Sequence, residues 1–368
     1  SMYLKQLHVH GLRNLKHIQL SLSPQVNLFH GPNGSGKTSI LEAIFLLGRG
    51  RSFRSRVLNT VINTQEQVCT AYGLRESSGV STPIGVSRGR QGDFLFKING
   101  QPIAAASALA ETLPLLLLNA EGFDLIGGGP QYRRRFIDWG VFHVEHNYKQ
   151  LVRRYQRVLK QRNSLMRHDR IDEQLLAVWD TEFVDLAQQI NTSRNAYLND
   201  LLPIVKQVAC ELSEGLGDVD FIINPGWDEA VGLPEVLHKD RPRDRLLKTT
   251  HHGPHRADLR IRIKKQNVSD ILSRGQLKVL ATAMQVAQGY LFYNKTGRSG
   301  LYLIDDLPAE LDIKHRQQVC EKLSALGAQI FVTGVERRDL LDLWSESTSE
   351  LRLFHVEQGS VREEHCTE

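Results

Sequence analysis

Eight residues near the N-terminus, GPNGSGKT at 31–38, have the types and spacing of a phosphate-binding loop. The loop follows an apolar stretch and precedes a helical pattern. Its glycines allow backbone N–H groups to point at a triphosphate at the positive end of that helix. Lys37 would bring its charge to the β and γ phosphates, and the Thr38 hydroxyl would reach Mg²⁺. The sequence therefore predicts a site for ATP and Mg²⁺. The residues expected to bind the nucleotide are Gly31, Pro32, Asn33, Gly34, Ser35, Gly36, Lys37, Thr38 and Ser39.

A second chemical feature is LYLIDD at 301–306, in which four apolar residues end in two carboxylates. Such a strand can be buried in a central sheet. We expect Asp305 to hold Mg²⁺ through water and Asp306 to orient or deprotonate an attacking water. Together with Lys37, this predicts ATP hydrolysis. A monomeric P-loop kinase remains an alternative, although no residues indicate an acceptor pocket or a lid.

A third feature is the polar loop SRGQ, formed by Ser273, Arg274, Gly275 and Gln276, directly before the helical run LKVLATAMQVAQGYLF. It would present a hydroxyl and backbone N–H groups at a positive helix end, which suits an anion. An ordinary helix cap is the alternative interpretation.

The surrounding pattern predicts the elements that position these residues. Residues 2–30 alternate as a hairpin plus a buried strand, and a helix is expected from Thr38 to about Leu47. Asn99-Gly100 predicts a tight hairpin turn. Further strands are expected at QVCTAYGL, TPIGVSR, DFLFKI, PLLLLN, ADLRIRIK, GLYLIDD, AQIFVTG and ELRLFHVEQGSV.

Between these two groups of strands the spacing of apolar residues becomes helical, and Pro203 predicts a kink or break. We therefore predict an α/β ATPase lobe with mixed sheets and helices, formed by residues 1–125 and 246–368. A mainly helical second lobe, residues 126–245, interrupts it.

The net charge of +5 is unevenly distributed, since residues 133–170 hold eleven Lys or Arg and three acids. Arg153, Arg157 and Lys160 share one face of a predicted helix. This face would suit the phosphates of DNA, and a solvated helix face is the alternative.

The remaining features mainly exclude classes of protein. No apolar run approaches the ~18 residues of a membrane span and no secretory leader is evident, so we expect a cytoplasmic protein. Four widely spaced cysteines (69, 210, 320 and 366) indicate buried free thiols. His251, His252 and His255 could suggest a metal, but the Gly-Pro between them favours a turn.

Taken together, the motifs resemble the heads of ATP-binding cassette (ABC) ATPases and, more narrowly, the RecF family, which is related to SMC proteins. The resemblance covers essentially the whole chain. It rests on GLRNLKHIQL, GPNGSGKTSILEAIFLLGRGRSFR, EGFDLIGGGPQYRRRFIDWG, LKQRNSLMR, GPHRADL, LSRGQLK and LIDDLPAELD.

The resemblance implies a two-lobed head that forms a homodimer around two ATP molecules and binds single-stranded and duplex DNA. Slow, DNA-stimulated hydrolysis would release it, and it would act with RecR and RecO to help load RecA. Ser273, Gly275 and Gln276, with Arg274 in the same loop, would act on the partner's ATP. Asp312 would lie at the dimer interface, and Arg13 and Asn14 near the nucleotide.

Two departures separate the chain from transporter ATPases. Asn119 stands where those proteins carry a glutamine, and Thr333 stands where they carry a switch histidine. The resemblance therefore disfavours a membrane transporter subunit and makes Thr333 a candidate sensor of the γ-phosphate. An SMC protein proper would need long coiled-coil arms, for which a lobe of 120 residues is too short.

Overall fold

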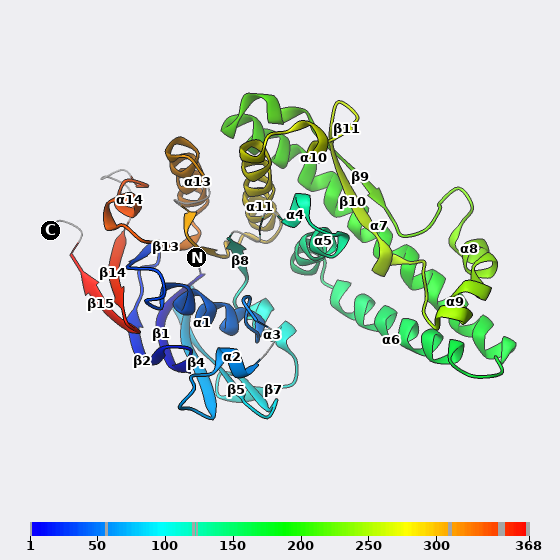
Figure 1. Cartoon of the computed structure of the whole chain (residues 1–368), viewed down its shortest axis with the longest axis horizontal. Helices are drawn as coiled ribbons and strands as arrows, with labels where there is room; N and C mark the ends of the chain where they lie inside the picture. Colours follow the sequence, from blue (N-terminus) through cyan, green and yellow to red (C-terminus); the bar gives the residue numbers. More distant parts are fainter. Residues whose placement is uncertain are drawn as a thin grey trace. The chain divides into compact units, whose positions relative to one another are not determined.

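The structure, a computed structural model, describes residues 2–55, 58–119, 122, 124–307, 311–344 and 350–365. The chain divides into two compact units (Figure 1). Unit 1 contains Ser1–Gly122 and Thr282–Glu368, and unit 2 contains Phe123–Ala281. The chain has an α/β fold, as predicted. Among the described residues, no helix combines the length and apolarity that a membrane span requires.

A largely parallel sheet positions the predicted chemistry in unit 1. The phosphate loop follows β3, the acidic pair follows β12, and β13 lies between these two strands. Because parallel strands end at the same edge of a sheet, the two motifs meet there. In order across the sheet, the strands are β15 (Ser360–Glu364), β14 (Leu351–Glu357), β3 (Val26–His30), β13 (Gln329–Gly334), β12 (Leu301–Ile304) and β8 (Leu115–Leu118), with only β15 antiparallel to its neighbour.

The second sheet of unit 1 is antiparallel. Its strands, in order, are β2 (Leu15–Ser21), β1 (Met2–Leu12), β4 (Val68–Ser77), β5 (Val80–Gly89), β6 (Phe94–Ile98) and β7 (Gln101–Ile103). Asn99 and Gly100 join β6 to β7 with φ of 55° and 76°, which confirms the predicted tight turn.

Helix α1 (Lys37–Arg49) belongs to one hydrophobic core with residues of both sheets. Its Ile40, Leu41 and Ile44 are fully buried in that core, as are Leu4 of β1 and Leu303 of β12. The other helices of unit 1 are α2 (Leu58–Val61), α3 (Ala106–Thr112), α13 (Ile313–Leu326) and α14 (Arg337–Leu341).

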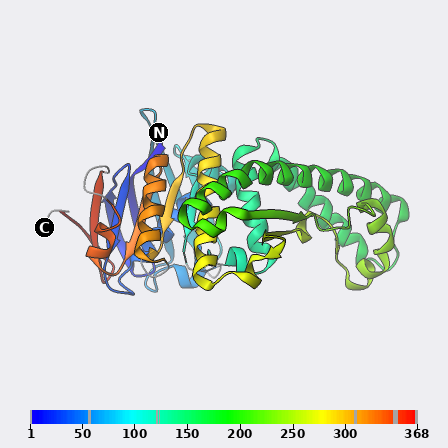
Figure 2. The same cartoon turned by 90° about the horizontal axis from the view of Figure 1, so that it is seen from above.

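Unit 2 is mainly helical. The helices α6 and α7 lie side by side (Figures 1 and 2). The helices are α4 (Asp124–Gly127), α5 (Pro130–Val144), α6 (Tyr148–Met166), α7 (Glu173–Leu212), α8 (Leu233–Lys239), α9 (Arg241–Leu247), α10 (Val268–Ile271) and the start of α11 (Arg274–Thr296), which ends in unit 1. A small antiparallel sheet has the order β11 (Gln266–Asn267), β10 (Asp258–Ile263) and β9 (Val219–Asn224).

Unit 2 differs from the sequence expectation in three respects. Of the kink or break predicted at Pro203, the break does not occur: helix α7 continues, because Leu201 and Val205 on either side are fully buried and hold both turns in place. The strand β9, rich in apolar and β-branched residues, lies inside the segment expected to be helical. Unit 2 extends to Ala281, whereas the second lobe was expected to end at residue 245; the pairing of β10 with β9 places residues 258–263 in unit 2.

Candidate nucleotide-binding site

The phosphate loop lies between β3 and α1, where the sequence placed it. Gly36 caps α1 with φ of 118° and Gly34 has φ of 80°, both conformations that favour glycine. A Cβ on Gly31 would lie 2.0 Å from the Val356 oxygen. Conformation and close approach therefore explain three of the loop's glycines.

Lys37 is almost completely buried at the start of α1. Its Nζ donates to the Gly31 oxygen at 2.6 Å, so the ammonium is held within the loop. Burial lowers the pKa of Lys37 from its ordinary value, while the negative charges of Asp306 and Asp305 act against this shift. The two carboxylates after β12 are thus close enough to interact electrostatically with the Lys37 ammonium.

Asp305 and Thr38, the two residues predicted to hold Mg²⁺, contact each other. The Thr38 hydroxyl lies 3.1 and 3.4 Å from the two Asp305 carboxylate oxygens. Hydroxyl and carboxylate oxygens are hard donors that suit Mg²⁺. The side chains present therefore fit the cation that the sequence predicts.

Asp306 has a left-handed backbone with φ of 56°, which is unusual for a residue other than glycine. Its N–H donates to the Thr333 hydroxyl at 2.9 Å. The same Thr333 hydroxyl donates to Asp305 Oδ1 at 2.7 Å. Thr333, at the end of β13, is therefore bonded to both residues of the acidic pair.

Asn14 and Arg13 lie in the turn between β1 and β2, beside the loop. The Asn14 side-chain amide donates to the backbone carbonyl oxygens of Gly34 and Ser35 at 3.4 and 3.2 Å. The Arg13 guanidinium instead donates from Nε and Nη2 to Glu42, at 2.7 and 3.1 Å. In this structure Arg13 supports α1, and its contact with nucleotide stays a prediction.

Glu42 is a site residue that the sequence did not reveal. This α1 carboxylate is completely buried and accepts hydrogen bonds from Arg13, Arg54 and Ser52. Burial alone would raise the pKa of Glu42, but these hydrogen bonds and the nearby arginine charges hold it below its ordinary value. The sequence feature that could have indicated this buried carboxylate was a single acid in the apolar helix segment ILEAIF, followed by the arginine-rich segment GRGRSFRSR.

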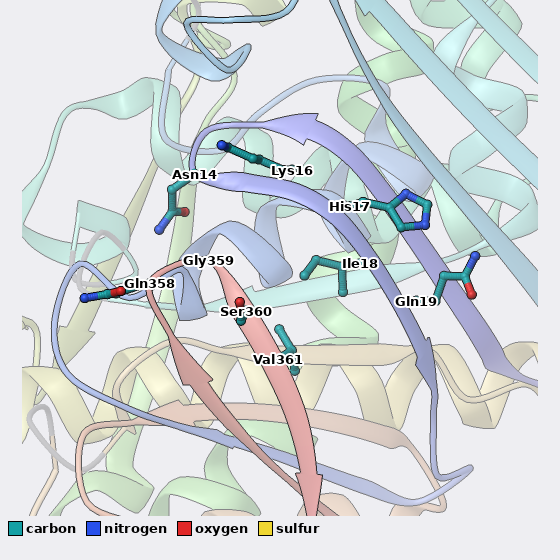
Figure 3. Close-up of a pocket in the computed structure, with 9 residues that line it drawn as sticks. All are labelled: Asn14, Lys16, His17, Ile18, Gln19, Gln358, Gly359, Ser360 and Val361. Atoms are coloured by element: carbon teal, nitrogen blue, oxygen red, sulfur yellow. The ribbon is translucent and has the colours of Figure 1, made fainter.

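A hollow of about 440 Å³ adjoins the phosphate loop (Figure 3). Asn14 belongs to its lining and also bonds the loop. Gly359, in the turn between β14 and β15, donates to the Ser35 oxygen at 2.8 Å. The lining is mostly polar and consists of Asn14, Lys16, His17, Ile18, Gln19, Gln358, Gly359, Ser360 and Val361.

The loop Ser273–Gln276 is exposed at the start of α11. Ser273 and Gln276 form a reciprocal capping box: the Ser273 N–H donates to Gln276 Oε1 at 2.8 Å, and the Gln276 N–H to Ser273 Oγ at 3.2 Å. The helix-cap interpretation is therefore realised in this structure, and action on a partner's ATP stays a prediction.

Asp312 caps α13, where its carboxylate accepts from the His315 N–H at 3.0 Å and is 65% exposed. Ala309 and Glu310 of the same AELD motif lie outside the described residues.

On α6, Arg153, Arg157 and Lys160 are all exposed, whereas Tyr155 and Val158 are buried on another face. Not every basic residue of the segment contributes to this surface, since Arg162 is buried against Asp180 and Asp244 at 2.7 and 2.8 Å.

The three histidines of HHGPHR have protein partners. His251 lies 2.7 Å from Asp244, and His252 lies 2.7 Å from Asp240. His255 lies 2.8 Å from the backbone oxygen of Thr250 and 2.5 Å from the Tyr155 hydroxyl. Asp240, Asp244 and His251 are close enough to share a cation, but the Arg162 guanidinium already occupies Asp244. The geometry therefore favours a structural role. Cys69 and Cys320 are buried free thiols, as expected, whereas the Cys210 thiol is exposed, contrary to that expectation, because it lies on the solvent side of α7. Cys366 lies outside the described residues.

Comparisons with known proteins agree along the whole chain. The family model of the RecF/RecN/SMC N-terminal domain matches residues 3–361. The DNA replication and repair protein RecF of Pseudomonas aeruginosa (strain LESB58) is 44% identical over 361 residues, covering 98% of this chain and 97% of the relative. The same-named protein of Azotobacter vinelandii is 44% identical over 368 residues, with both chains fully covered.

Solved structures show the same similarity. A structure of the recombination mediator protein RecF-ATP in the RecFOR pathway has a TM-score of 0.87 and 26% identity, covering 99% of this chain and 98% of the other. An SMC head bound to the C-terminal winged-helix domain of ScpA has a TM-score of 0.59 and 13% identity, covering 98% and 96%, which shows the fold alone.

Proposed function

This chain belongs to the RecF/RecN/SMC N-terminal domain family and, within it, to the RecF proteins, and we propose that it is an ATP-dependent recombination mediator that acts on DNA. The observation that carries the proposal is the junction of Thr38 and Lys37 with Asp305 and Asp306 at one edge of the parallel sheet. The ATPase chemistry and the family point to the same class of protein.

The hydrolysis step follows from these side chains. Lys37 exchanges its bond to the Gly31 oxygen for the phosphate oxygens of ATP. Thr38 and Asp305 would hold Mg²⁺, which neutralises charge on the β and γ phosphates when bound. Asp306 orients the attacking water and accepts its proton. Since the site offers no covalent nucleophile in this scheme, positioning and charge account for the catalysis.

In the proposed function, the exposed loop Ser273–Gln276 at the start of α11 mediates ATP-dependent dimerisation. Ser273, Gly275 and Gln276 lie at the positive end of a 23-residue helix, and their exposure leaves them accessible to a second copy. In the dimer they contact the γ-phosphate bound by the partner, and Asp312 lies at the same interface. ATP thereby holds the two copies together, and hydrolysis releases them.

We place the protein on DNA at single-strand gaps and their junctions with duplex, in the cytoplasm. The exposed basic face of α6 supports contact with phosphates. The solved relatives are described as recombination mediators of the RecFOR pathway. By this kinship the protein acts with RecR and RecO and helps to load RecA, and its DNA-stimulated ATPase is slow.

The decisive experiment is the light-scattering mass of the Asp306→Asn variant, with and without ATP and Mg²⁺ and without DNA. Asparagine tolerates the left-handed conformation at this position, so the change removes the carboxylate and keeps the turn. ATP should bind without being hydrolysed, and the mass should double. A variant that also carries Ser273→Arg should bind ATP and stay monomeric. A monomer in both conditions, with ATP bound, would contradict ATP-driven dimerisation.

A further inference from the structure

Thr333 occupies the centre of the ATPase site in the sheet. It lies at the end of β13, between the strand that leads into the phosphate loop and the strand that leads into the acidic pair. Its side chain is buried, and its residue is only 1% exposed. A buried hydroxyl at this place needs hydrogen-bond partners, and it finds them in the acidic pair.

The hydroxyl makes two bonds of good length. It donates to Asp305 Oδ1 at 2.7 Å and accepts from the Asp306 N–H at 2.9 Å. A hydroxyl has one hydrogen, and here that hydrogen is committed to Asp305. Thr333 therefore does not offer a donor to a γ-phosphate in this arrangement, contrary to the sensor role suggested by its place in the sequence.

The bond to Asp306 has a conformational consequence. Asp306 adopts φ of 56°, an unfavourable conformation for a residue with a side chain. Such a conformation persists only where the surroundings hold it. The hydrogen bond from the Asp306 N–H to Thr333 is one such restraint, and it fixes the direction in which the Asp306 carboxylate leaves the backbone.

The bond to Asp305 matters when a cation is present. Two hydroxyls, Thr38 and Thr333, hold the Asp305 carboxylate in this structure. A cation bound through the Thr38 oxygen competes with the bond from Thr38 to Asp305. The bond from Thr333, at the end of β13, does not involve the Thr38 oxygen, so it can keep the carboxylate oriented.

We propose that Thr333 is a positioning residue of the ATPase site, which orients the Asp305 carboxylate for the magnesium ion and holds the Asp306 backbone in its turn. This inference rests on the proposed ATPase function. It adds to that function a residue that acts through the Asp305 carboxylate and the Asp306 backbone.

The test compares Thr333→Val, which keeps the shape and removes the hydroxyl, with Thr333→Ser, which keeps the hydroxyl. Three quantities are measured: ATP binding without divalent cation, using a fluorescent analogue; Mn²⁺ affinity in the presence of ADP, by electron paramagnetic resonance; and kcat with its dependence on Mg²⁺. Thermal melting checks folding, and Thr333→Ala replaces the valine variant if that variant does not fold.

We expect cation-free ATP binding to stay within about threefold in all variants. Loss of a hydrogen bond to a charged group should weaken Mn²⁺ binding and lower kcat by about tenfold or more in Thr333→Val. Thr333→Ser should restore both quantities. Unchanged Mn²⁺ affinity and kcat in the valine variant would overturn the inference, as would equal losses in the valine and serine variants.

The failure of this inference and the failure of the proposed function look different. If the chain is no ATPase, the unaltered protein neither binds ATP nor hydrolyses it. If only the inference is wrong, the unaltered protein does both and Thr333→Val behaves like it.

Discussion

At the scale of single residues, the proposed nucleotide site depends most on the ammonium of Lys37. It is nearly buried and bonded to the Gly31 oxygen within its own loop, so ATP has only to replace one acceptor with another. We predict that Lys37→Met lowers ATP affinity by roughly 10- to 100-fold, the value of a hydrogen bond to a charged group. Isothermal titration calorimetry measures this loss. The matched change at an exposed lysine, Lys160→Met, should leave ATP affinity unchanged, and tight binding by Lys37→Met would refute the loop assignment.

His255 is expected to make the stability of unit 2 depend on pH. His255 Nε2 lies 2.8 Å from the backbone carbonyl oxygen of Thr250. A carbonyl oxygen can only accept, so Nε2 carries the hydrogen of the neutral ring. Nδ1 therefore accepts from the Tyr155 hydroxyl at 2.5 Å. Burial lowers the pKa of His255 to about 4, against the opposing effect of the bond to Thr250. The folded state therefore keeps this imidazole neutral well below the pH at which an unfolded chain protonates it.

The sign of the pH effect follows from that difference. Between about pH 6.5 and 4 the unfolded chain binds the extra proton, so the contribution of His255 to stability is present above pH 6.5 and is lost as the pH falls toward 4. We predict a loss on the order of 1 to 3 kcal/mol. Urea unfolding at a series of pH values should show this loss in the unaltered protein and a flatter profile in His255→Asn. Parallel profiles would show that His255 titrates normally in the folded protein.

Single residues also show where the sequence was insufficient. Lys37, Thr38, Asp305 and Asp306 could be predicted because each lies in a short contiguous motif with a strand on one side. Glu42 could not, since its partners Arg13 and Arg54 come from different loops and meet it only in the folded core. The role of Thr333 likewise depends on strand order, which places β13 beside β12.

At the scale of elements, strands with regular apolar alternation and the long helices of unit 2 were predicted, whereas strand β9 was not. The alternation of β1, β2 and the strands after them is visible in the sequence, and the Asn99-Gly100 turn follows from local backbone preference. Proline at 203 predicted a kink or break, but α7 is not broken there, because the burial of Leu201 and Val205 outweighs the local preference. Strand β9 was missed because its partner β10 lies 34 residues further along the chain.

The N-terminus of α11 caps its helix and, in the proposed dimer, would also contact a partner's ATP, and these two roles can be separated experimentally. Ser273 caps the helix in this structure, and the proposed dimer also needs its hydroxyl beside a partner's phosphate. Ser273→Asp keeps an acceptor for the Gln276 N–H, so the helix should remain as stable as before. Its negative charge should repel the γ-phosphate and abolish ATP-dependent dimers, whereas Ser273→Asn should preserve both the cap and the dimers.

Melting temperature and light-scattering mass with ATP distinguish these variants. Normal dimers of Ser273→Asp would reduce this loop to a helix cap and remove its role across the interface. A fall in melting temperature for Ser273→Asp would instead show that the carboxylate fails as a cap, and Ser273→Asn then becomes the variant that tests the cap.

At the scale of the whole molecule, the net charge of +5 and the basic face of α6 determine how the protein would meet DNA. We predict that replacing Arg153, Arg157 and Lys160 together by glutamine lowers DNA affinity. Each lost phosphate contact should also reduce the slope of log affinity against log salt by about 0.9 on duplex and about 0.7 on single strands. Fluorescence anisotropy at several salt concentrations measures both quantities.

The charge-matched control replaces Lys206, Lys239 and Arg243 by glutamine. These residues are exposed elsewhere on unit 2, and their replacement should leave the slope unchanged. An equal fall for both triple variants would indicate a general effect of net charge, and no change in the α6 variant would make this helix a solvated surface.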